Sequence, residues 1–391
     1  MINISKKKDC CGCNACGDVC PKHSITFKID KEGFWYPEVE MDTCIDCHLC
    51  EKVCPLLNKE EYKNIDGYVK PKTYALVHKN IEVRFDSTSG GAFTALAEEV
   101  YKQGGFVGGA IYNEDWSVSQ FLSSSKNDLP KLRSSKYLQS HFDGFYKSVK
   151  EALKTEKPVL VCGSPCQMAA MFRYLKKPYE NLIIVDYICR GIASPMYFRK
   201  WINYLENKHN SKVIFYKAKS KELGWRKLST RIEYANGEAD VIAGHDNPWL
   251  MMQYKVPEIC RPSCFECSFK GFPRTSDITM GDFWGIDTIL PEFYDNMGCS
   301  VAIVRNHTAM EVLDAIENLE KQEVPLEDGI KKQANAFKPS TKPEAREAFW
   351  NDYRMMSFKQ VAHKYFAYKA TRRLKCWVHR AMFQFGLRKD P

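Results

Sequence analysis

Residues 10–21 read CCGCNACGDVCP, and residues 44–55 read CIDCHLCEKVCP. Apart from Cys11, both stretches follow the spacing C-x2-C-x2-C-x3-C-P, which is typical of bacterial ferredoxins with two 4Fe-4S clusters. The first three thiolates of each run hold one cluster, whereas the fourth thiolate ligates the other cluster. The repeat therefore predicts a ferredoxin-type domain over residues 1–60.

This crossover assigns eight cysteines to two clusters. Cys11 is treated as a spare, because only Cys10 keeps the spacing that both runs share. A structural zinc site is the alternative, but zinc takes four ligands in two pairs, and two runs of four cysteines do not divide that way. We expect cluster one to be held by Cys10, Cys13, Cys16 and Cys54, and cluster two by Cys44, Cys47, Cys50 and Cys20.

The composition is that of a globular protein. The 391 residues are 44% hydrophobic and 27% charged, which suits two or three domains with buried cores. Seventeen cysteines at metal-ligand spacing, with no export signal or long apolar run, indicate a reducing, cytoplasmic setting rather than a disulfide scaffold. The net charge of +9 is partly offset by thiolate-bound clusters, and no interleaved aromatic and basic pattern is present. We therefore expect no nucleic-acid partner.

Strand and helix patterns alternate beyond a polar linker at residues 58–72. One helical pattern begins at Gly91, and a second spans residues 168–175. Asn236-Gly237 predicts the turn of a β-hairpin. Such alternation implies α/β layers with largely parallel strands. The predicted strands lie at residues 74–78, 106–112, 158–162 and 182–188.

Three loops fall where strands should end and helices begin, the usual place for a cofactor in such folds. The glycines of residues 87–91 would let backbone amides approach a phosphate at a helix N-terminus. In residues 163–167, Ser164 suits the helix N-cap, so Cys166 lies in the first turn, where the helix dipole favours a thiolate. The third loop is residues 189–191.

Cys260, Cys264 and Cys267 have the spacing of metal ligands that lack one partner. Cys166 and Cys189 are the nearest candidates, since each follows a predicted strand. Two strand-end loops and a C-x2-C turn can converge at the switch point of the sheet. Zinc, or buried reduced thiols, remain alternatives. We expect a third cysteine group made of Cys166, Cys189, Cys264 and Cys267, with Cys260 as the alternate to Cys166.

Together these motifs resemble the beta-subunit family of coenzyme F420-reducing hydrogenases and dehydrogenases over roughly residues 1–310. The resemblance implies an α/β flavin-binding core in two parts, residues 73–155 and 156–310. The expected fold is thus α+β and α/β: a ferredoxin domain, this core, and a mostly helical basic tail over residues 311–391. The motifs that carry the resemblance are residues 89–91, 135–140, 163–167, 189–191, 264–267 and 276–285.

The resemblance also implies FAD, and a third 4Fe-4S cluster beside it. Lys136 is expected to place a positive charge against the reduced flavin, which tends toward an anion. Arg190 stands where many bacterial relatives carry histidine, so the resemblance does not identify the substrate of this chain. It also does not imply the use of a deazaflavin. The residues expected to bind the flavin are Ser89, Gly90, Gly91, Ser135, Lys136, Tyr137, Gln139, Ser140, Gly163 and Asp282.

The function expected from these features is that of a flavin-dependent iron–sulfur oxidoreductase. It would couple hydride transfer with a small-molecule donor or acceptor to single-electron transfer with a ferredoxin or other redox partner protein. Bacterial relatives of this form are associated with surface-polysaccharide genes, so we expect a role in that metabolism. The alternative is a non-catalytic electron-transfer subunit. A cluster-based sensor of nucleic acid has only the net charge in its favour.

The C-terminal stretch from Arg354 to Arg388 is basic and carries interleaved aromatic residues. This composition predicts a helix that contacts anionic lipid, and so a peripheral position at the inner face of the membrane. Packing of the aromatic side on the protein's own core is the alternative.

Overall fold

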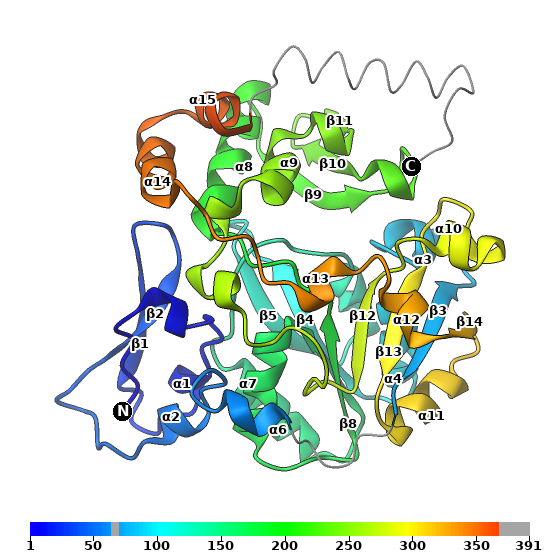
Figure 1. Ribbon diagram of the computed structural model, residues 1–391, viewed down its shortest axis with the longest axis horizontal. Helices are drawn as coiled ribbons and strands as arrows, with labels where there is room; N and C mark the ends of the chain where they lie inside the picture. Colours follow the sequence, from blue (N-terminus) through cyan, green and yellow to red (C-terminus); the bar gives the residue numbers. More distant parts are fainter. Residues whose placement is uncertain (64–69, 367–391) are drawn as a thin grey trace.

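A nine-stranded sheet forms the centre of the computed structural model, which describes residues 1–63 and 70–366 (Figure 1). Its strand order is β14-β3-β13-β12-β8-β7-β4-β5-β6. The middle strands β12, β8, β7 and β4 run parallel, and the flanking pairs β12/β13, β13/β3, β3/β14 and β4/β5 are antiparallel. The bounds are β3 (Lys72–His78), β4 (Phe106–Tyr112), β5 (Val118–Ser123), β6 (Ser140–His141), β7 (Val159–Gly163), β8 (Leu182–Tyr187), β12 (Ile278–Asp282), β13 (Ser300–Val304) and β14 (Leu319–Val324).

Helices cover both faces of the parallel strands, because these strands are apolar on both sides. In β7, Leu160 packs on one face, whereas Val159 and Val161 pack on the other. The mixed α/β layers predicted from the sequence are thereby confirmed. One face is covered by α4 (Ala92–Lys102), α5 (Leu129–Leu132) and α11 (His307–Ala315), and the other by α6 (Phe145–Leu153) and α7 (Pro165–Leu175).

The cysteine-rich N-terminus forms a small unit beside this sheet. Its hairpin pairs β1 (Ile25–Ile29) with β2 (Trp35–Val39), and its two short helices are α1 (Ala15–Asp18) and α2 (Leu49–Lys52). The unit docks on α6 through Asp18, whose carboxylate accepts hydrogen bonds from the N–H groups of Gly144 (2.8 Å) and Tyr146 (3.1 Å). An acidic side chain suits this helix N-terminus, where backbone N–H groups lack partners.

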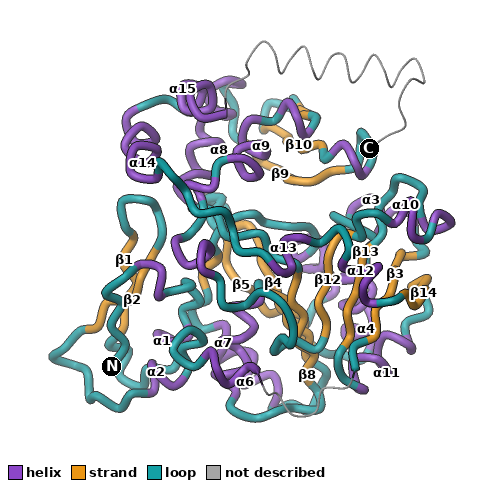
Figure 2. Tube along the Cα trace, in the orientation of Figure 1, coloured by secondary structure: helices purple, strands orange, loops and turns teal. Residues whose placement is uncertain are grey.

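A second, three-stranded sheet stands above the central one, and Figure 2 shows loops running between the two. The predicted hairpin around Gly237 is confirmed as β10 and β11. This sheet shares an aromatic-rich core with four helices. Its elements are β9 (Val213–Ser220), β10 (Ser229–Tyr234), β11 (Ala239–Ile242), α8 (Pro195–His209), α9 (Pro248–Lys255), α14 (Arg346–Met355) and α15 (Phe358–Val361).

The C-terminal region is helical, as expected, but it is not a detached tail. It first supplies the edge strand β14, which the sequence pattern did not predict. In α14, Phe349, Trp350 and Tyr353 are buried, so this part packs on the protein's own core. Residues 367–391, with most of the predicted lipid-binding stretch, lie outside the described residues. The remaining helices are α3 (Ile81–Asp86), α10 (Ile286–Ile289), α12 (Leu326–Ile330) and α13 (Ala334–Phe337).

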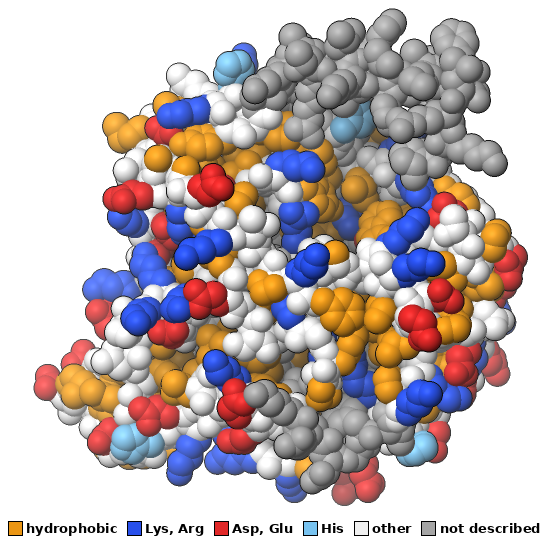
Figure 3. All heavy atoms as spheres, in the orientation of Figure 1, with side chains coloured by type: hydrophobic (Ala, Val, Ile, Leu, Met, Phe, Trp, Pro, Cys, Tyr) orange, Lys and Arg blue, Asp and Glu red, His pale blue; other side chains and the backbone are white. Residues whose placement is uncertain are grey.

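Among residues 1–63 and 70–366, none of the helices combines the length and the apolar character that crossing a membrane would need. On the face drawn in Figure 3, acidic and basic side chains are interspersed rather than gathered into one charged patch.

Candidate functional site

The structure places the ferredoxin cysteines in two neighbouring groups. Burial, together with the charges of Cys13, Cys10 and Cys54, raises the pKa of Cys16 well above its ordinary value, so these four thiols are neighbours. The cysteines of the second group line one small cavity, and two of them accept backbone hydrogen bonds, as cluster ligands do. These bonds are Ile2 N–H to Cys50 Sγ (3.2 Å) and Ser24 N–H to Cys20 Sγ (3.3 Å), and the cavity is lined by Cys20, Cys44, Cys47 and Cys50.

The donor geometry bears on the choice between zinc and a cubane. A single zinc ion needs its ligands to converge on one point. In the described part of the chain, no three His, Cys, Asp or Glu side chains converge in that way. A cubane spreads its four thiolates over four iron atoms, so it does not require its ligands to converge on one point.

The third cysteine group also comes together. Cys166 lies in the first turn of α7, and Cys189 follows β8. Burial raises the pKa of Cys189 to about 12, with the charges of Cys166 and Cys267 adding to the effect, and burial with Cys260, Cys189 and Cys166 nearby raises that of Cys264. The Ile192 N–H donates to Cys264 Sγ at 3.4 Å. These thiols come from three separate segments of the chain but occupy one site.

Cys260, the alternate ligand, lies at the edge of this group. It is buried, and its backbone pairs with Ala193 as an isolated β-bridge. Burial raises the pKa of its thiol to about 11, while the charges of Arg190 and Arg346 lower it. The charge of Cys260 acts on Cys264, so Cys260 borders the third cysteine group on one side and the two arginines on the other.

Cys11, treated as a spare from its spacing, joins the two sites. Hydrogen bonds to Cys13 and Cys166, together with burial, raise the pKa of the Cys11 thiol. The same contacts lower the pKa of Cys13, and that of Cys166 to about 7. Cluster one and the third cysteine group therefore lie one side chain apart.

A central cavity of about 440 Å³ opens at the carboxyl ends of β4, β7, β8 and β12, where a parallel sheet usually binds its ligand. Helix α9 closes it through Leu250 and Tyr254, and the loop between β9 and β10 does so through Leu228. Most of the predicted flavin-binding residues line it: Ser89, Gly91, Ser135, Lys136, Tyr137, Ser140, Gly163 and Asp282.

Gly90 and Gln139 lie outside the lining of the central cavity, contrary to the sequence expectation. Gly90 packs against the sheet, and an added Cβ would come within 2.1 Å of the Leu76 carbonyl oxygen. Gln139 is buried and accepts a hydrogen bond from Arg261 at 2.8 Å. Both residues shape the wall from behind rather than touching what the cavity holds.

Lys136 lines the cavity, but its ammonium group is already engaged. It donates to the carbonyl oxygens of Lys131 (2.6 Å), Leu132 (3.2 Å) and Arg133 (2.8 Å), at the C-terminus of α5. Burial lowers its pKa to about 7. A charge against a flavin would require Lys136 to leave these carbonyls.

The wall of the cavity also contains a buried ion pair, Lys219 and Asp282. Lys219 Nζ donates to Asp282 Oδ2 at 2.9 Å, and both side chains are about nine-tenths buried (10% and 11% exposed). Burial alone would lower the pKa of Lys219, but Asp282 and Tyr137 raise it well above its ordinary value. The ammonium lies 5.6 Å from the Tyr137 ring centroid and 5.9 Å from that of Trp284. The cavity thus has a polar, charged spot within an aromatic wall.

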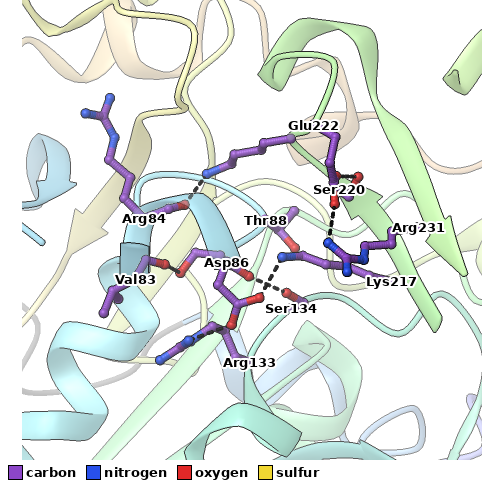
Figure 4. A network of polar contacts seen from close by, with 12 residues as sticks. Val83, Arg84, Asp86, Thr88, Arg133, Ser134, Lys217, Ser220, Glu222 and Arg231 are labelled. Atoms are coloured by element: carbon purple, nitrogen blue, oxygen red, sulfur yellow. Dashed lines mark hydrogen bonds and ion pairs between the residues drawn. The ribbon is translucent and has the colours of Figure 1, made fainter. Parts of the chain in front are cut away.

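Lys217 on β9 and Lys221, which directly follows β9, hold the segment at residues 84–89 in place (Figure 4). Lys217 donates to Asp86 at 2.8 Å, and Arg133 donates to the same carboxylate at 2.6 Å. Lys221 donates to the carbonyl oxygens of Arg84 and Ser89. Because side chains alternate along a strand, the spacing K-x-K-x-K was the signal in the sequence for this shared face.

The floor of the cavity carries an amide network that the sequence analysis missed. The Gln120 and Gln167 amides both donate to Ser140 Oγ, at 3.3 and 3.0 Å. Gln120 is 9% exposed, and its Oε1 atom has no hydrogen-bond partner among the described residues. A buried acceptor without a donor is costly, so a ligand with an N–H or O–H group fits here. A flavin, whose ring carries such a group, passes this test.

Two parts of the chain match known protein families. Residues 156–328 match the sequence model for the C terminus of the coenzyme F420 hydrogenase/dehydrogenase beta subunit, and residues 9–57 match that of a 4Fe-4S dicluster domain. The C-terminal half of the core thus matches this beta-subunit family, and the N-terminus matches a ferredoxin-type domain that holds 4Fe-4S clusters.

The chain is similar to proteins of Methanosarcina mazei and Methanocaldococcus jannaschii. It is 22% identical to a subunit of the F420H2 dehydrogenase of Methanosarcina mazei over 45% of this chain and 51% of the relative. It is 24% identical to an uncharacterized protein of Methanocaldococcus jannaschii over 44% of this chain and 56% of that protein. The chain thus spans about half the length of these relatives. A chain of the F420-reducing [NiFe] hydrogenase complex from Methanosarcina barkeri is 17% identical, covering 69% of this chain and 90% of that one, with a TM-score of 0.41.

The part of the chain between the two matched regions also builds the site. Residues 72–141 supply β3 to β6, and the cavity lining there includes Ser89, Gln120 and Ser135. The cavity wall thus combines this segment with the matched C-terminal part, which contributes Cys189, Lys219 and Asp282.

Proposed function

We propose that this protein is a flavin-dependent iron–sulfur oxidoreductase, in which FAD occupies the central cavity and a third 4Fe-4S cluster occupies the third cysteine group. The observation that carries the proposal is the position of Cys189. This residue lines the central cavity and also belongs to the third cysteine group. A redox centre on these thiols would therefore border whatever the cavity binds.

FAD would supply exchange of a hydride with a small molecule on one side and of single electrons with the clusters on the other. The chain's own residues have distinct tasks around it. Gln120 Oε1 offers an acceptor to a ring N–H, and Lys221 holds the carbonyl of Ser89 so that the loop at residues 87–91 keeps its shape. Tyr187 and Trp284 line the wall and help to exclude water.

From the cavity, the arrangement of thiols suggests a route for electrons through the third cysteine group to cluster one and then cluster two. A ferredoxin or other redox protein would be the partner at the far end. The proposed substrate is a small hydride donor or acceptor. A role in surface-polysaccharide metabolism stays a prediction. A non-catalytic electron-transfer subunit is the second candidate, favoured because one relative is itself a subunit of a dehydrogenase.

Anaerobic purification followed by iron counting and flavin extraction tests the proposal. Three cubanes give about twelve iron atoms per chain, and two give about eight. Cys264→Ser should lower the count by about four, because it removes a ligand of the third cluster only. Cys299→Ser is the matched control, since Cys299 is buried in the sheet away from the cysteine groups.

Two results would count against this function. If Cys264→Ser leaves the iron content unchanged, the proposed third cluster is refuted. Chains that hold their full iron but release no flavin would favour the non-catalytic subunit instead.

A further inference from the structure

Arg261 connects the loop of the third cysteine group to cluster one. It lies between Cys260 and Cys264 in sequence and has no exposed surface. Its guanidinium reaches into the ferredoxin domain, where Nη2 donates to the Sγ atom of Cys10 at 3.3 Å and Nε donates to the Cys10 carbonyl at 2.8 Å. A side chain from one redox site therefore touches a ligand of the other.

The remaining contacts hold the guanidinium rigidly in place. Nη2 also donates to the Trp35 carbonyl at 3.0 Å, and Nη1 donates to Gln139 Oε1 at 2.8 Å. The guanidinium carbon lies 4.2 Å from the Tyr36 ring centroid and 5.5 Å from that of Phe34. Five donors in a fixed plane suit such a site, which a flexible lysine could not reproduce.

None of these acceptors is a carboxylate. An arginine is always charged, and a buried cation is costly unless a negative group compensates it. The negative group within reach of Arg261 is the sulfur of Cys10. The local charge balance is therefore met only when Cys10 is a thiolate, as it is when it ligates iron.

We infer that Arg261 is a positioning residue that sets the reduction potential of cluster one and holds this cluster against the third cysteine group. Reduction adds one electron to cluster one and no proton. A nearby cation stabilises the more negative, reduced cluster, and a hydrogen bond to a ligand sulfur acts in the same direction. Arg261 thus makes cluster one an easier acceptor than it would otherwise be.

The position of Cys11 supports this inference. Cys11 contacts Cys13 of cluster one and Cys166 of the third cysteine group, so cluster one is the part of the ferredoxin domain nearest to the core. A raised potential at that point favours electron transfer into the ferredoxin domain. The inference depends on the two ferredoxin clusters and not on the proposed flavin.

The test is a redox titration of the full chain, purified anaerobically and followed by electron paramagnetic resonance. Arg261→Gln removes the charge but can still donate to a carbonyl. We expect one cluster midpoint to move to more negative potential by a tenfold change in its reduction equilibrium, which is about 59 mV for one electron. Arg261→Lys restores the charge and should return that midpoint part of the way. The other midpoints should stay in place.

Arg305→Lys is the control, because Arg305 is also buried but donates to Ser276 and Thr279 rather than to a cysteine. It should leave every midpoint unchanged. The inference is overturned if Arg261→Gln keeps its iron and all its midpoints. It is also overturned if both Arg261 variants lose about four iron atoms, one cubane's worth, because Arg261 would then be needed for cluster assembly rather than for tuning.

Discussion

Lys219 and Asp282 form a buried ion pair in the wall of the central cavity, and its strength can be measured. Removing one partner from such a pair leaves an uncompensated charge and costs about 3–5 kcal/mol. We expect Asp282→Asn and Lys219→Met each to lower the free energy of unfolding by about that amount. The double variant should lose less than the sum, because the two single changes harm the same interaction. Denaturant unfolding of the four proteins checks this.

The control pair is Lys154 and Glu151, which is 2.7 Å long but exposed (64% and 56%). Solvent screening limits such a pair to about 0.2–1 kcal/mol. Equal coupling energies for the two pairs would show that the cavity pair is as well solvated as the surface pair.

The residues of the site differ in whether a short stretch of sequence is enough to predict them. The ferredoxin cysteines could be recognised from the sequence, because the geometry of a cluster fixes short spacings within one loop. Gln120 and Lys219 were not, because their position depends on which strands pair across the sheet. Gln139 was assigned to the flavin from a local motif, yet its amide is engaged with Arg261, far away in the sequence.

At the scale of elements, the stretch predicted to contact lipid begins at the end of α14 and continues through α15. Its aromatic residues were compatible with lipid or with the protein's own core, because periodicity fixes a face but not what covers it. Phe358 of α15 is buried, whereas residues 367–391 lie outside the described residues, so the lipid contact stays a prediction. In α14 itself the aromatic face is buried, and Trp350 Nε1 donates to the Glu258 carbonyl at 3.1 Å. The central strands could be predicted, because a short apolar run that is buried on both faces is typical of a parallel strand at the centre of an α/β sheet.

Trp350→Ala tests the packing of α14. Deleting a fully buried tryptophan leaves a cavity and costs about 3–5 kcal/mol. We expect the midpoint of urea unfolding to fall accordingly. Met355 lies on the same helix but is 87% exposed, so Met355→Ala should change stability by no more than about 0.5 kcal/mol. A tryptophan variant as stable as the methionine variant would mean that α14 is not part of the core in solution.

At the scale of the whole molecule, the ferredoxin domain and the core depend on each other unequally. The domain has one hairpin and two four-residue helices of its own, whereas the core has the nine-stranded sheet. Docking is helped by a partly buried ion pair between Arg346 of α14 and Glu32 (2.6 Å), and by the Tyr146 hydroxyl, which donates to the Cys13 carbonyl at 2.7 Å. Most of the domain's internal order must therefore come from its clusters.

Removing the iron should consequently unfold the ferredoxin domain and spare the core. A small domain built around metal gains its folding free energy from the metal, and its thiols without iron cannot replace that contribution. Limited proteolysis of the chelator-treated chain, with mass spectrometry of the fragments, should place the early cuts within residues 1–63 and leave residues 72–324 protected. The untreated chain, digested in parallel, should resist cutting in both regions. Early cuts spread evenly through the sheet would instead mean that the clusters stabilise the whole molecule. The docking contacts of Tyr146 and Arg346 would then couple the unfolding of the ferredoxin domain to that of the core.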